Sequence, residues 1–381
     1  MTVSVPVSGR PRAGIRSTLS VRLAGPVLAG LALSACGPSP VDMVEHPMTT
    51  TPTRMAGEEL QRAAEPEEAC ASTPVAPEFP GVGDRTVPTA EPGVGPVAVP
   101  RSPERILALG ATAVDVACAL GLQDLVVGTS GLPEDADVYL PAPLTELPEI
   151  ALGAGVPAAE VAADARELDP DLVVLAGADG LDPDVVRALE GVAPTVLYDT
   201  AVPQWADATE MVADAYGRPR AGGDLLLDVI ERAQLVADST TPRDTRVSLV
   251  SVAGRSGEGA DDVRVQPADT LGSMMLEAVG AHRPPAQRTR DGERIPPLPE
   301  SPPVGDELDG DVIFAVVGGG PRSEEAAREV FGSGRWNALD AVGARRMFVV
   351  DRAVWEGAGP VAARAVLGDI RESINGVAPG T

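Results

Sequence analysis

Short apolar runs that alternate with helical patterns constrain the fold of this 381-residue chain more than any other feature. The first unit is an apolar run from Ile106 to Leu109, followed by Gly110 and by a helical pattern from Ala113 to Leu120. Similar units recur toward the C-terminus. Strands that alternate with helices favour parallel sheets covered by helices on both faces. We therefore predict an α/β fold with mostly parallel sheets.

The units form two sets separated by a longer helical pattern. The expected strands are 106–109, 125–127, 172–175, 195–198, 247–252, 263–265, 312–317 and 347–350. The expected helices are 113–120, 158–168, 183–189, 270–279, 323–331 and 359–370. We expect an N-terminal lobe at 101–202, a linking helix at 203–240 that glycines and Pro219 interrupt, and a C-terminal lobe at 241–381.

The N-terminal residues have the layout of a secretory signal. Residues 1–35 carry four arginines and no acidic residue, and an apolar stretch from Leu23 leads into Leu33-Ser34-Ala35-Cys36. That stretch is about half the roughly 20 residues that a membrane-spanning helix needs. We predict a signal peptide at 1–35 and a lipidated Cys36 that anchors the protein on the extracytoplasmic face of the membrane. The alternatives are an uncleaved amphipathic anchor and a chance match.

Residues 36–100 are rich in proline and are expected to form a spacer, with a possible short helix at 58–71. Cys70 and Cys118 are the cysteines that remain. An even pair in an exported chain indicates a disulfide, which would stabilise the fold by about 3 to 4 kcal/mol. The alternative is one buried and one exposed thiol.

Charge and residue types exclude several classes of function. The formal net charge is −26, and losing the four arginines of residues 1–35 would make it −30, which disfavours binding to nucleic acid or to anionic membrane surfaces. The chain has two histidines, His46 and His282, so a bare metal site is not expected, and a bound iron or cobalt ion would bring its own ligands. No Gly-x-Ser-x-Gly or Walker motif occurs. We predict no enzymatic activity and no intrinsic cofactor.

Ligands of open α/β sheets bind beyond the carboxyl ends of the strands. The loops expected there carry small polar residues, arginines that could bind an anion, and aromatic residues that could stack on a planar ligand. Each arginine could instead be a surface ion-pair partner. The candidate ligand contacts are Thr112, Ser130, Tyr139, Arg255, Arg283, Arg288, Arg322 and Trp355.

Motifs in both lobes resemble those of a transport family. They are the 105–110 segment, Pro170-Asp171-Leu172-Val173, and in the C-terminal lobe 336–341, 346–351, Trp355, Gly359-Pro360 and 367–370. These motifs and their order along the chain resemble those of the solute-binding lipoproteins of ABC transporters for ferric siderophores, haem and vitamin B12. The resemblance covers about residues 101–374 and is strongest to the actinobacterial ferric-siderophore branch, in which the 280–288 segment and the cysteine pair have similar counterparts.

The resemblance implies two Rossmann-like lobes joined by one long helix, a class III periplasmic binding protein with little hinge motion. It implies a monomer that captures a ferric siderophore, or haem or cobalamin, for an ABC importer. One carboxylate per lobe would contact the permease: Glu160 in the first lobe, and Glu300 in the second, where Glu293 and Glu307 are also possible. Because no second-lobe carboxylate matches well, an envelope scaffold that keeps the fold without a permease is the second interpretation.

Overall fold

The computed structural model describes residues 66–90, 95–177, 181–200, 205–239, 245–252, 263–288 and 308–374. Contacts divide the chain into Met1–Pro47 and Met48–Thr381, and every described residue belongs to the second unit. The predicted signal peptide, Cys36, Arg255 and Glu300 lie outside the described residues. We call residues 66–200 the first lobe and residues 245–374 the second lobe.

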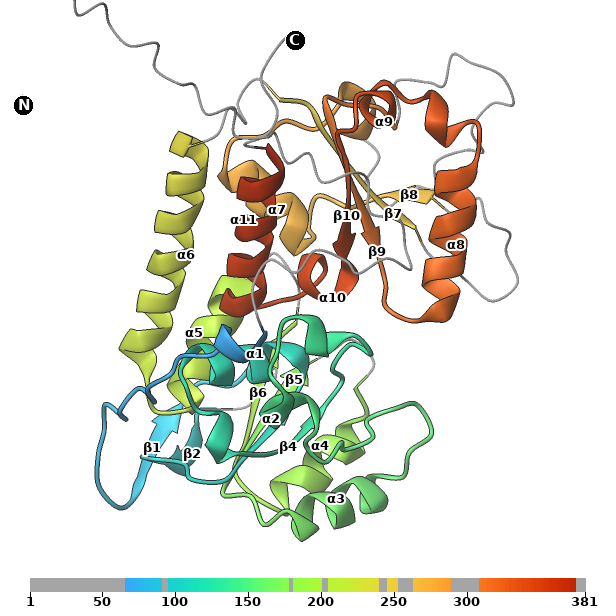
Figure 1. Ribbon diagram of the computed structural model, residues 1–381. Coiled ribbons are helices and arrows are strands. Elements are labelled where there is room, and N and C mark those ends of the chain that lie inside the picture. The colour runs from blue at the N-terminus through green and yellow to red at the C-terminus, as the bar shows by residue number, and fades with distance from the viewer. Residues whose placement is uncertain are drawn as a thin grey trace, which may run out of the picture. The chain divides into compact units, whose positions relative to one another are not determined.

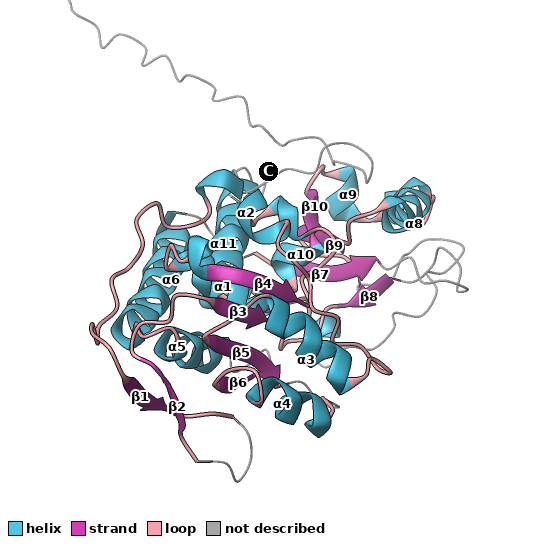
Figure 2. Cartoon of the chain, turned by 90° about the horizontal axis from the view of Figure 1, so that it is seen from below, coloured by secondary structure: helices cyan, strands magenta, loops and turns pink. Residues whose placement is uncertain are grey.

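The first lobe contains a four-stranded sheet whose strands are all parallel. Its order is β4-β3-β5-β6, and its strands are β3 (Ile106–Leu109), β4 (Val126–Ser130), β5 (Leu172–Gly177) and β6 (Thr195–Asp199). The helices of this lobe are α1 (Ala111–Ala119), α2 (Ala142–Thr145), α3 (Ala158–Glu167) and α4 (Pro183–Glu190), with 3-10 turns η2 (Gln123–Leu125) and η3 (Ala136–Val138). Figure 2 shows α3 and α4 on one face of the sheet and α1 on the other. Burial on both faces explains why the sequences of the two central strands, β3 and β5, are continuously apolar.

The second lobe repeats this plan with one antiparallel strand. Its sheet has the order β10-β9-β7-β8, with β7 (Val247–Val252), β8 (Val263–Val265), β9 (Val312–Val317) and β10 (Met347–Asp351). β8 runs antiparallel to β7. Only residues 253–262 connect the two strands, and a parallel pair needs a crossover of a dozen or more residues. The helical elements are α7 (Leu271–Ala278), η6 (Pro285–Gln287), α8 (Pro321–Gly332), η7 (Trp336–Ala338), α9 (Asp340–Gly343), α10 (Arg352–Trp355) and α11 (Pro360–Ile374).

The expected linking helix is two helices, α5 (Trp205–Ala215) and α6 (Pro219–Ser239). The chain turns at Gly217, whose φ of 82° suits glycine, and a Cβ there would lie 2.8 Å from the Arg101 carbonyl oxygen. Pro219 then opens α6, as proline often opens helices. α6 packs against α5 at one end and against α11 and α7 farther along, so it is the helix that joins the lobes (Figure 1).

Part of the expected spacer is folded and contacts α1, α5 and the turn between α5 and α6. Strands β1 (Asp84–Val87) and β2 (Val97–Pro100) form an antiparallel hairpin, and η1 (Pro66–Glu68) precedes it. Arg85 bonds the Asp214 carboxylate at 2.8 Å, and Arg218 Nε donates to the Val75 carbonyl oxygen at 2.9 Å. The Cys70–Cys118 disulfide joins this segment to α1, as predicted.

Candidate ligand-binding site

The lobes contact each other through loops that follow strands. The amide of Gly319, after β9, donates to Asp135 Oδ2, in the loop after β4, at 2.7 Å. A Cβ at Gly319 would lie 2.5 Å from the Asp135 Cβ, so glycine permits this approach. The carboxyl ends of the two sheets therefore meet at this contact, where ligands of α/β proteins are expected.

A buried carboxylate joins the lobes at a second point. Asp115 of α1 is 1% exposed and accepts bonds from the backbone amides of Val361 and Ala362, at 2.8 and 2.9 Å, in the first turn of α11. A carboxylate at this end of a helix is favoured by the unpaired amides and by the helix dipole. Burial raises the pKa of Asp115 to about 6, against the lowering effect of these two bonds and of Arg364. The carboxylate thus caps a helix of the opposite lobe and fixes the lobes to each other.

Thr112 and Ser130 lie at the strand ends of the first lobe, but both are buried, at 5% and 3% exposed. The Thr112 hydroxyl hydrogen-bonds the Tyr198 hydroxyl, which lies under Gly110. Burial raises the pKa of Tyr198, so this hydroxyl keeps its proton. Thr112 is therefore already engaged within the protein.

Arg352 provides a cation at the strand ends of the second lobe. It directly follows β10, its Nη2 donates to the Val252 carbonyl oxygen at the end of β7 at 3.0 Å, and its Nε lies 3.6 Å from Glu356 Oε1. A Cβ at Gly318, after β9, would lie 2.9 Å from its Nη1. The guanidinium thus spans the ends of three strands while its side chain remains 31% exposed. Arg352 was not among the ligand contacts predicted from the sequence, although its position directly after an expected strand could have indicated it.

Three of the predicted arginines are described, and they differ in environment. Arg283 donates to the carbonyl oxygens of Leu249 and Gln266 and to the side chains of Ser273 and Gln287. This arginine therefore ties β7 to α7 and η6 inside the second lobe. Arg288 is exposed and donates to the Arg283 carbonyl oxygen, and Arg322 is exposed in the first turn of α8.

The predicted aromatic contacts are buried. Trp355 is 1% exposed, its Nε1 donates to Asp369 Oδ2 at 2.8 Å, and its ring centroid lies 4.7 Å from that of Phe314. A Cβ at Gly272 would lie 2.4 Å from this indole, so Trp355 is packed in the core, where it is not exposed for stacking on a ligand. Tyr139 is 3% exposed and lines a different pocket.

Of the predicted permease contacts, Glu160 is exposed in the first turn of α3, where its side chain is accessible to another protein. Among the described residues, no group of three or more His, Cys, Asp or Glu is placed to hold a metal ion. The described helices include none with the length and apolar character needed to cross a membrane.

No family model matches the chain. The "Probable siderophore-binding lipoprotein YfiY" of Bacillus subtilis is 25% identical over 289 residues, covering 71% of this chain and 82% of YfiY. The resemblance predicted from the sequence is confirmed. This similarity supports the receptor interpretation and not the scaffold alternative.

Solved structures share the fold. The crystal structure of Staphylococcus aureus SirA complexed with staphyloferrin B matches with a TM-score of 0.57 at 20% identity, covering 76% of this chain and 98% of SirA. The siderophore periplasmic binding protein from the fuscachelin gene cluster of Thermobifida fusca matches with a TM-score of 0.57 at 22% identity, covering 73% and 99%. The chain has the class III binding-protein fold, as predicted.

Proposed function

We propose that this protein is a receptor that captures a ferric siderophore outside the cytoplasm and delivers it to an ABC importer. The observation that carries the proposal is the similarity to a siderophore-binding lipoprotein along most of both chains. Cys36 would carry the lipid anchor, and Glu160 with Glu300 would contact the permease. Mass spectrometry of the mature N-terminus tests the anchor: a protein without lipid on Cys36 would contradict it.

The described contacts support binding by a preformed site. Asp115 and Asp135 hold the two lobes together, and Arg352 presents a partly exposed guanidinium at the strand ends. A siderophore that wraps Fe³⁺ with oxygen ligands often carries negative charge, which an arginine can bind with forked hydrogen bonds. Arg255, Arg288 and Arg322 are further candidates for this contact.

A thermal unfolding screen of the protein with ferric siderophores, haem and cobalamin tests the receptor function. A ligand at about 100 times its dissociation constant should stabilise the folded state by about 2.7 kcal/mol. We expect at least one ferric siderophore to stabilise the folded state by this amount, and haem and cobalamin to stabilise it less. If no ferric siderophore raises the unfolding midpoint, the proposed function is wrong.

Variants of Arg352 test the role of the strand ends. Arg352→Gln should weaken siderophore binding by about tenfold, because a charged hydrogen bond is worth about 1.5 to 3 kcal/mol, whereas Arg352→Lys should lose less. Arg328→Gln on the exposed surface of α8 is the matched control. Siderophore affinity is measured by calorimetry. If Arg352→Gln and Arg328→Gln bind the siderophore equally well, Arg352 does not contact it.

A further inference from the structure

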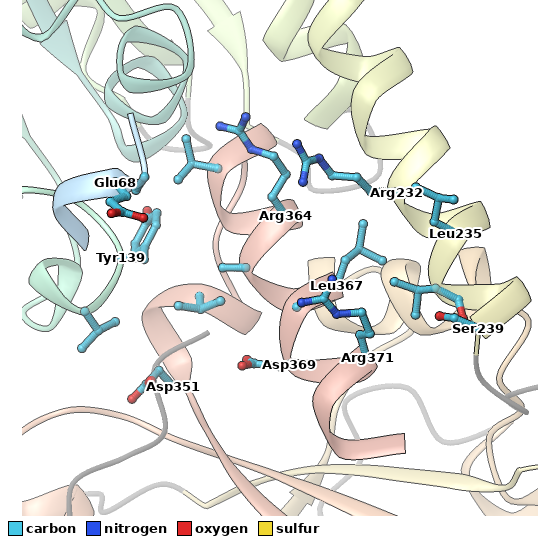
Figure 3. Close-up of a pocket in the computed structure, with 17 residues that line it drawn as sticks. Glu68, Tyr139, Arg232, Leu235, Ser239, Asp351, Arg364, Leu367, Asp369 and Arg371 are labelled. Atoms are coloured by element: carbon cyan, nitrogen blue, oxygen red, sulfur yellow. The ribbon is translucent and has the colours of Figure 1, made fainter. Parts of the chain in front are cut away.

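A pocket of about 580 Å³ lies between α6 and α11 (Figure 3). Glu68 of η1, Ala69 and the Tyr139 side chain form its opposite wall. From the β10–α10 region it is lined by Asp351 and Val354, whereas Arg352 and Glu356 do not line it. Its volume is within the range of about 300 to 1,000 Å³ that is typical of small-molecule sites.

Two buried donors at this pocket lack acceptors. Tyr139 Oη and Arg364 Nη2 are buried, and neither has a hydrogen-bond partner among the described residues. Both side chains line the pocket. A buried donor without a partner costs about 1 to 3 kcal/mol, which a ligand with acceptor oxygens would recover.

Charged residues of both signs line the pocket. Arg232, Arg364 and Arg371 line it, together with the acidic residues Glu68, Asp351 and Asp369. Asp369 lies at the pocket wall, and burial raises its pKa to about 8, so it is mainly protonated at neutral pH and can donate a hydrogen bond. Asp228 of α6, which does not line the pocket, bonds Arg232 at 2.7 Å and lies 3.9 Å from Arg364, so it offsets part of the positive charge of these two arginines.

The remaining wall is apolar. Val138, Val236, Val361 and Leu367 line the pocket, and Leu235 of α6 lies at its edge with 68% of its surface exposed. Figure 3 shows Leu235 and Arg232 on the α6 side and Tyr139 with Glu68 across from them. A ligand that fits has one anionic head and an apolar body.

We propose that this pocket is a second binding site, separate from the siderophore site, for a small carboxylate with an apolar body. Tyr139 and Arg364 donate to the carboxylate, Arg371 adds positive potential, and the aliphatic wall covers the acyl portion. The proposal does not depend on the siderophore function, because Arg352, the cation at the strand ends, does not line this pocket.

Octanoate, octylamine and octanol are suitable probes, because they share an apolar chain and differ in charge. Binding to the full protein is measured by calorimetry at constant ionic strength. We expect saturable one-site binding of octanoate and at least tenfold weaker binding of the other two probes. Absence of octanoate binding, or octylamine binding of equal strength, would overturn the proposal.

Tyr139→Phe tests the orphaned hydroxyl. Since Tyr139 Oη makes no hydrogen bond in the described structure, its removal should not lower the unfolding midpoint and should raise it if the unpartnered hydroxyl is costly, while octanoate binding weakens about fivefold to tenfold. Unchanged octanoate affinity in Tyr139→Phe would contradict the assignment.

Substitutions at two exposed leucines of α6 test whether octanoate binds in this pocket. Leu235 and Leu227 are both exposed on this helix, at 68% and 56%, but only Leu235 lines the pocket. Leu235→Glu should weaken octanoate binding about tenfold by placing a carboxylate at the pocket edge, whereas Leu227→Glu should leave it unchanged. Equal effects of the two substitutions, or displacement of octanoate by a bound siderophore, would place octanoate elsewhere and overturn the proposal.

Discussion

At the scale of single residues, a buried carboxylate with a raised pKa makes the stability of the folded protein depend on pH. Asp369 accepts a hydrogen bond from the Trp355 indole, which lowers its pKa, yet burial together with the nearby Asp351 and Glu372 raises this pKa from 3.8 to about 8. The folded protein therefore binds this proton more tightly than the unfolded chain does. The contribution of Asp369 to stability is fully present below the ordinary pKa and falls as the pH rises from about 4 to about 8.

Asp369→Asn tests this linkage, because asparagine keeps the shape and the acceptor oxygen without a titrating proton. We expect the wild-type protein to lose up to about 1.4 kcal/mol per pH unit relative to Asp369→Asn across this window. Urea unfolding of both proteins at pH 5, 6, 7 and 8 measures the difference. A constant difference across the series would mean that Asp369 ionises normally in the folded state.

Trp355 shows what residue patterns leave open. Its position after a strand made it a candidate for ligand stacking, but its environment depends on Gly272 and Asp369, which lie far from one another in the sequence. Arg352, three residues earlier, is the partly exposed side chain at the strand ends. Sequence position predicted the region of the site but not which side chain is accessible.

At the scale of elements, the apolar runs predicted the sheets well. β3, β5, β7 and β9 were all expected, because strands buried on both faces are continuously apolar. The β1–β2 hairpin was not expected, because only Val87 and Val99 in it are buried and the pattern is weak. It is held instead by contacts such as Arg85 to Asp214, 129 residues apart.

The disulfide should determine how firmly the N-terminal segment is attached. Cys70 and Cys118 are separated by 48 residues, and such a loop contributes about 3 to 4 kcal/mol in the chain-entropy description. The Cys70→Ala and Cys118→Ala double variant should lose about this much stability and expose the β1–β2 strand amides to hydrogen exchange. Stability equal to that of the wild type would show that the hairpin contacts alone hold the segment.

At the scale of the whole molecule, the lobes are joined more tightly than by the linking helix alone. One continuous hydrophobic cluster includes Ile106 of the first sheet, Val229 of α6 and Phe314 of the second sheet. Asp115 and Asp135 add polar contacts between the lobes. These contacts agree with the limited hinge motion that the family resemblance implies.

Asp115→Ala should weaken this connection. It leaves two buried amides of α11 without an acceptor, which should lower the free energy of unfolding by about 1 to 3 kcal/mol. Asp115→Asn keeps one acceptor and should lose less. Denaturant unfolding measures both, and an Asp115→Ala variant as stable as the wild type would show that this cap does not hold the lobes together.

The sequence by itself determined the α/β class, most strands and helices, the disulfide partners and the resemblance to siderophore receptors. These features depend on local hydrophobic periodicity, on turn residues and on ordered motifs, all of which can be read along the chain. Only the tertiary structure decided that the linking helix begins at Pro219, that Trp355 is core, that Asp115 caps a helix of the other lobe, and that a second pocket lies beside α6. Each of these depends on contacts between residues far apart in the sequence, and local patterns carry no information about such partners.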